Sequence, residues 1–95
     1  MTSPSPYRTT PVFDENTLPA AIRGAHATKE GVWGLLRVLE GRVHLVFHEP
    51  ARTLEVTPDA PGPIPPQAEH HVETCGPMRM QVEFYHEPPV ALDDD

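Results

Sequence analysis

The imidazole of His70 is the side chain best placed for chemistry in this sequence. It follows a turn stiffened by Pro65 and Pro66 and opens a strand, an arrangement that can aim a side chain at the interior of a small β-barrel. His70 has the parity of Val72, so if Val72 packs inward, the imidazole points inward as well. His71 has the opposite parity and is expected to meet solvent. His70 is therefore a candidate ligand, and a buried histidine with purely structural hydrogen bonds is the competing interpretation.

A metal site in a β-barrel usually combines two or three imidazoles with a carboxylate or amide from different strands. His26 could supply a second imidazole, because the parity of the segment before it favours an inward direction. Glu83 could supply the carboxylate, with Gln81 as an alternative. The parity that buries its apolar strand neighbours turns Glu83 outward, unless the apolar layer lies against another subunit. We expect His26, His70 and Glu83 as ligands of a divalent ion such as Zn, Fe, Ni or Mn, and assign no catalytic residue.

Other kinds of chemistry have less support in the sequence. No Gly-x-Ser-x-Gly elbow and no glycine-rich phosphate loop is present. Cys75 precedes a Gly-Pro turn, and no pattern marks a base that would activate its thiol. Arg23 and Arg37 are candidate charge partners for an anionic ligand, with solvated surface cations as the alternative interpretation.

The elements that must position these residues are strands. Apolar residues recur with period two, and no window sustains the pattern of an amphipathic helix, which predicts an all-β chain. Glu40-Gly41 lies between two such runs and predicts a β-hairpin. Five prolines between residues 58 and 66 exclude a helix or a central strand there. Strands are expected over 20–28, 32–39, 42–48, 52–57, 70–74 and 78–86.

Size and charge limit the class of protein. The chain has 95 residues and 13 prolines, a net charge of −7 and one cysteine. A domain this small has little stability to spare, so a homodimer is expected. The acidic balance argues against nucleic acid, and no apolar run approaches the roughly 20 residues that cross a bilayer. A lone cysteine fits a reducing cytoplasm. We expect a flexible tail over 1–11, a β-barrel domain over 12–87 and an acidic flexible tail over 88–95.

Several segments together resemble one known family. Residues 26–34, 38–41, 65–73 and 82–85 occur in the order found in the TehB/YeaR-like family of small cupins, which is associated with tellurite resistance. The resemblance covers about residues 11–87 and implies a small single-domain, cupin-like β-barrel of jelly-roll type. Metal-dependent cupins usually carry two histidines one residue apart and then a glutamate. Here Thr28 stands two residues after His26 and Gly34 stands about where the glutamate is expected, so the first cupin motif is mostly missing.

The resemblance and the residues together give a functional expectation. We expect a cupin-like domain associated with tellurite or stress resistance, which binds a small molecule, an oxyanion or a divalent metal ion through histidines inside the barrel. One alternative is a metal-dependent dioxygenase or isomerase, which needs Glu83 or an equivalent on the inner face. The other is a non-catalytic dimeric interaction module.

Overall fold

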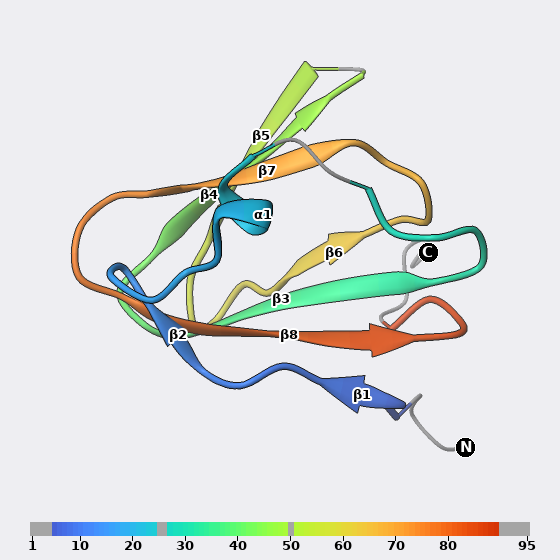
Figure 1. Ribbon diagram of the computed structural model, residues 1–95, viewed down its shortest axis with the longest axis horizontal. Coiled ribbons are helices and arrows are strands. Elements are labelled where there is room, and N and C mark those ends of the chain that lie inside the picture. Colours follow the sequence, from blue (N-terminus) through green and yellow to red (C-terminus); the bar gives the residue numbers. More distant parts are fainter. Residues whose placement is uncertain (1–4, 25–26, 50, 90–95) are drawn as a thin grey trace.

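The chain folds into two antiparallel β-sheets that face each other (Figure 1). The computed structural model describes residues 5–24, 27–49 and 51–89, and at residues 21 and 23 the backbone alone. The all-β prediction is confirmed, because one four-residue helix is the only helix in these ranges. The elements are β1 Arg8–Thr9, β2 Phe13–Asp14, α1 Ala20–Arg23, β3 Trp33–Glu40, β4 Val43–His48, β5 Ala51–Val56, β6 Gly62–Ile64, β7 His70–Thr74 and β8 Arg79–Tyr85.

The larger sheet has five strands and the smaller sheet has three. The larger one runs β1-β8-β3-β6, with β2 also paired to β8, and the smaller one runs β5-β4-β7. Among the described strands no ladder joins the two sheets, so the cupin-like fold is a sandwich rather than a barrel with continuous hydrogen bonding. The site residues expected from the sequence on β7 and β8 therefore belong to different sheets.

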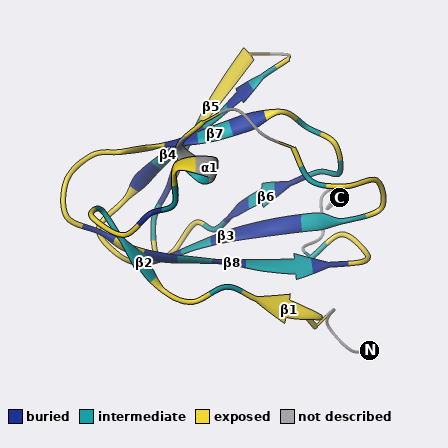
Figure 2. Ribbon diagram, in the orientation of Figure 1, coloured by how far each residue is buried: buried dark blue, intermediate teal, exposed yellow. Residues whose placement is uncertain are grey.

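A core of aliphatic side chains holds the two sheets together. Along β4 the side chains alternate between buried and half-buried, as expected for a strand with one face on the core. Figure 2 shows buried segments within strands of both sheets. The buried core cluster comprises Leu18, Leu36, Val38, Val43, Leu45, Phe47, Val56, Ile64, Val72, Met78, Met80 and Val82.

The predicted hairpin at Glu40-Gly41 is wrong, although the turn itself is present. β3 pairs with β8 on one edge and with β6 on the other, so no edge of β3 is left for β4. The chain instead crosses from the large sheet to the small one at Gly41, whose φ of +76° is a conformation that favours glycine. The hairpin partner of β4 is β5, in a register that runs from Val43 opposite Val56 to His48 opposite Ala51.

Three segments outside the main strands also differ from the expectation. The predicted strand over 20–28 begins with the helix α1, in which the amide of Gly24 donates to the carbonyl of Ala20 at 3.0 Å. Residues 8–9, inside the expected flexible tail, form β1 on the edge of β8. The proline-rich loop contains β6, which is an edge strand, as its prolines require.

Candidate functional site

His70 points into the space between the two sheets. Its side chain is 1% exposed. The Nδ1–H of the imidazole donates to the carbonyl of Ala68 at 2.7 Å, which fixes the orientation of the ring. The ring also lies 6.0 Å from the ring of Phe47. The inward orientation is the one that its parity with Val72 predicts.

A small apolar cavity lies beside His70. Its volume is about 60 Å³. The lining is mostly aliphatic and aromatic, and among the described residues His70 is the only ionisable side chain in it. A space of this size holds one or two water molecules, whereas clefts for small-molecule ligands measure about 300–1,000 Å³. The residues that line the cavity are Thr10, Ile22, Thr28, Gly34, Leu36, Ile64, His70, Val72, Val82 and Phe84.

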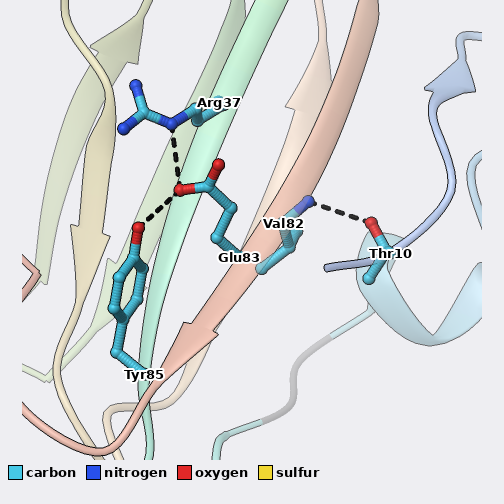
Figure 3. Close-up of polar contacts among 5 residues, drawn as sticks. All are labelled: Thr10, Arg37, Val82, Glu83 and Tyr85. Carbon is cyan, nitrogen blue, oxygen red and sulfur yellow. Dashed lines mark hydrogen bonds and ion pairs between the residues drawn. The ribbon is translucent and has the colours of Figure 1, made fainter. Parts of the chain in front are cut away.

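Glu83 lies on the opposite face of the large sheet from His70. Its neighbours Val82 and Phe84 line the cavity, so the alternation of β8 turns the Glu83 carboxylate outward. There Oε1 accepts a hydrogen bond from the Nε of Arg37 at 3.0 Å and another from the hydroxyl of Tyr85 at 2.7 Å (Figure 3). The sheet therefore separates the expected carboxylate ligand from the expected imidazole. His26, the third expected ligand, lies outside the described residues.

The environment of Tyr85 in this network makes the stability of the protein depend on pH. Burial raises the pKa of Tyr85 above 10.0, and its hydrogen bond to Glu83 raises it further. Folding thus favours the neutral phenol. The contribution of Tyr85 to stability is therefore fully present below about pH 10 and is lost as the pH rises through the folded-state pKa.

We expect Tyr85→Phe to lower stability at neutral pH by about 1 kcal/mol, through loss of one hydrogen bond. At about pH 11 the difference from the parent protein should shrink or reverse, because phenylalanine cannot ionise. Urea unfolding at both pH values measures this, with Tyr7→Phe, on a half-exposed ring, as the control. A constant gap between Tyr85→Phe and the parent protein would contradict the assignment.

A row of four ionisable side chains crosses the outer face of the small sheet. The Nε2 of His48 lies 2.7 Å from the Nδ1 of His71, and the Nε2 of His71 lies 2.9 Å from a carboxylate oxygen of Glu73. Glu69 approaches the Nδ1 of His48 at 3.5 Å. The strand alternation predicted that His71 faces outward, but not that it pairs with His48. The pairing follows from the register of β4 against β7, which places Val46 opposite His71.

Cys75 lies beyond the end of the same row. Its sulfur is 3.5 Å from the Nδ1 of His44, and the thiol is exposed. This neighbour could not be predicted from the sequence, because His44 and Cys75 are 31 residues apart and the pairing of β4 with β7 sets the contact. In the described part of the chain no group of three or more His, Cys, Asp or Glu side chains has a geometry that could hold a metal ion.

A second, larger hollow opens at the end of the large sheet where β8 finishes. It has a volume of about 300 Å³ and is lined by Tyr7, Arg8, Ala27, Thr28, Lys29, Val32 and Phe84. We call it the Arg8–Lys29 cleft. Figure 1 shows β1, the end of β8 and the loop before β3 at this end of the molecule. Phe84 lines both this cleft and the small cavity beside His70.

Comparison with known proteins connects the chain to methyltransferases. The TehB-like domain family matches residues 8–82. Two curated relatives, each named a probable S-adenosyl-L-methionine-dependent methyltransferase TehB, come from two strains of Haemophilus influenzae and are 38% and 36% identical over 74 residues. The matches cover 70% of this chain and 25% of each relative, so the chain spans about a quarter of their length.

Solved structures agree with this match. The crystal structure of TehB from Haemophilus influenzae has a TM-score of 0.76 and 30% identity, and the match covers 84% of this chain and 30% of that one. A crystal structure of a protein from Escherichia coli strain K12 has a TM-score of 0.79 and 22% identity, over 90% of this chain and 92% of that one. The second likeness shows the fold alone.

These comparisons overturn the functional prediction. The relatives are named as S-adenosylmethionine-dependent methyltransferases, not as metal-binding cupins, so the prediction of a metal or small-molecule site built from barrel histidines is wrong, as is the alternative of a metal-dependent cupin enzyme. The predicted divalent metal cofactor is wrong for the same reason. The large sheet also separates the two expected ligands, since His70 faces its inner side from β7 and the Glu83 carboxylate lies on its outer side, which agrees with this correction. Among the described residues no helix is long and apolar enough to span a membrane. The homodimer and the cytoplasmic location stay predictions.

Proposed function

This chain belongs to the TehB-like domain family, and from that membership we propose that it is an accessory domain of S-adenosylmethionine-dependent methyl transfer. The observation that supports the proposal is the pattern of coverage. The chain matches about a quarter of each relative that is named a methyltransferase, while the match takes up most of the chain itself. The role we propose is to act beside a catalytic part, which corresponds to the remaining three quarters of those relatives, and to help position the methyl acceptor.

The described residues do not fit S-adenosylmethionine itself. The cofactor consists of an adenosine and a methionine joined at a cationic sulfonium, and its methionine part also carries an ammonium and a carboxylate group. The cavity beside His70, at about 60 Å³, is far too small for it. The Arg8–Lys29 cleft is larger, but both ionisable side chains that line it, Arg8 and Lys29, are cations and suit only the carboxylate of the cofactor. Among the described residues no carboxylate lines the cleft to bind the sulfonium or the ribose hydroxyls. We therefore assign the cofactor to the catalytic part.

The fold itself supports an accessory role. Cofactors with an adenosine group commonly bind at the carboxyl edge of a parallel sheet flanked by helices. In the described residues of this chain every strand pair is antiparallel, and the single helix has four residues. A rigid two-sheet domain of this kind can instead hold an acceptor or an interface in place, and positioning alone accounts for large rate effects in enzymes.

A chimeric enzyme tests the proposal. The quarter of Haemophilus influenzae TehB that matches this chain is either deleted or replaced by this chain, and S-adenosylhomocysteine formation is measured with tellurite as acceptor. We expect the chimera to exceed the deleted enzyme by about tenfold or more in kcat/KM, the size of effect that positioning gives. The isolated chain should neither form product nor bind S-adenosylmethionine in calorimetry. Turnover by the isolated chain, or a chimera no faster than the deleted enzyme, would contradict the proposal.

A further inference from the structure

We propose that the Arg8–Lys29 cleft binds a small organic anion, a carboxylate carried on an apolar or aromatic body. The proposal concerns this chain alone and does not depend on the methyltransferase role. It rests on three features of the cleft. Its two cations have no acidic partner among the described residues, the backbone under both is held in place, and apolar walls surround a volume suited to a small molecule.

The first feature is the charge balance. The chain carries twice as many acidic as basic residues, 14 against 7, so a cation that engages neither an acidic side chain nor an aromatic ring is unusual here. Five cations lie outside the cleft, and the structure describes the side chains of four of them. Each of these four contacts an acidic side chain or an aromatic ring. Arg8 and Lys29 form no ion pair within the described residues, and both line the same cleft. The engaged cations are Arg37 on Glu83, Arg42 on Glu55, Arg79 on Glu40, and Arg52 over the ring of Phe47.

The second feature is the anchored backbone under Arg8. Strand β1 lies on the edge of β8, with Arg8 opposite Phe84. The amide of Tyr7 donates to the carbonyl of Phe84 at 2.9 Å, and the amide of Thr10 donates to the carbonyl of Val82 at 2.9 Å. Hydrogen bonds on both sides of Arg8 therefore fix where its side chain leaves the sheet. Less conformational entropy is lost when an anchored cation binds a ligand than when a mobile one does.

Lys29 is anchored from the opposite side of the cleft. The carbonyl of Lys29 accepts a hydrogen bond from the amide of Val32 at 3.1 Å, which closes a turn with Gly31 at a φ of +78°. The preceding residue, Thr28, accepts a hydrogen bond at its carbonyl from the amide of Gln67 at 3.2 Å. The loop that carries Lys29 is thus attached to the proline-rich loop before β7, and the two cations face one cleft from separate, fixed segments.

The third feature is the apolar wall. Tyr7, Val32 and Phe84 supply aromatic and aliphatic surface, and the Tyr7 ring stacks on His86 with centroids 4.0 Å apart and planes inclined by 9°. Among the described residues no acidic side chain lines the cleft. A volume of about 300 Å³ suits a molecule of one or two rings. Apolar walls with a pair of cations match a ligand that is both anionic and apolar, better than an inorganic anion alone.

Three probes test the inference: 2-naphthoate, its neutral analogue 2-naphthamide, and inorganic phosphate. Each is titrated into the ¹⁵N-labelled full chain, and amide shifts are followed by NMR. We expect naphthoate to give saturable shifts clustered at residues 7, 8, 28, 29, 32 and 84. Naphthamide should bind about tenfold more weakly than naphthoate, because two exposed charge contacts together account for about that factor. Added salt should weaken naphthoate binding, since exposed charges are screened.

A double variant and a matched control complete the experiment. Arg8→Gln with Lys29→Gln should weaken naphthoate binding about tenfold. Arg42→Gln with Arg79→Gln removes the same net charge from two side chains that lie outside the cleft and are paired to glutamates. This control should change the affinity for naphthoate by less than about twofold. The inference is overturned if both double variants behave alike, if naphthamide or phosphate binds as tightly as naphthoate, or if no probe gives saturable shifts at the cleft.

Discussion

Replacing Gly41 by alanine is expected to lower the free energy of unfolding by about 2–4 kcal/mol, a large share of the roughly 5–15 kcal/mol typical of a domain. Two effects add. The φ of +76° at Gly41 is strained for any residue with a Cβ, at about 1 kcal/mol. A Cβ at this position would also collide with the carbonyl oxygen of Pro77 and lie 3.2 Å from the Cα of Met78. Because both neighbours are backbone atoms, relief requires a backbone shift, which costs about 1–3 kcal/mol more.

Gly31 is a matched control for this variant. Its φ of +78° is almost the same as that of Gly41, but a Cβ there would meet no atom within 4 Å. Gly31→Ala should therefore lower stability by only about 1 kcal/mol, from backbone strain alone. Urea unfolding of the two variants separates the two effects. Equal losses in both would show that the crossing between the sheets at Gly41 is not as tight as described.

The second large effect is expected for His70→Ala, at about 2–4 kcal/mol of stability. The variant removes a ring that is 1% exposed and enlarges the existing cavity of about 60 Å³. It also leaves the carbonyl of Ala68 without the hydrogen bond from Nδ1. His70 thus stabilises the packing where β4 ends and β7 begins, and its substitution is expected to lower the free energy of unfolding.

His44→Ala gives the comparison for His70→Ala. His44 lies on the outer, half-exposed face of β4, so its loss should change stability by no more than about 0.5 kcal/mol. Thermal unfolding of both variants at neutral pH measures the difference. Losses of similar size would contradict a structural role for His70 that depends on its burial.

Strand parity explains what the sequence could predict. The alternation around His70 and in β8 depends on neighbouring residues, so the inward direction of His70 and the outward direction of Glu83 could both be read from it. The hairpin prediction failed because the turn at Gly41 has the residues of a hairpin, while the choice of partner for β3 depends on β8 and β6, far away in the sequence. The helix α1 was missed because four residues are too short to show a helical period.

The candidate site was harder to predict than the fold. Arg8 was assigned to a flexible tail, because two-residue strands carry almost no periodic signal. Arg8 stands out only because most other cations are paired with acidic residues. Such pairs join positions far apart in the sequence, such as Arg37 and Glu83, which are 46 residues apart. A sequence shows how many cations a chain has, but only the fold shows which of them remain without an acidic partner.

The prolines around β6 have a consequence for how this protein can associate with others. β6 is the outermost strand on its side of the large sheet, and Pro63 at its centre has no amide hydrogen to offer a further strand. Pro61 and Pro65 flank it with the same deficiency. An incoming chain therefore finds no continuous ladder to extend, and the edge is protected against the strand-by-strand growth that leads to fibrils.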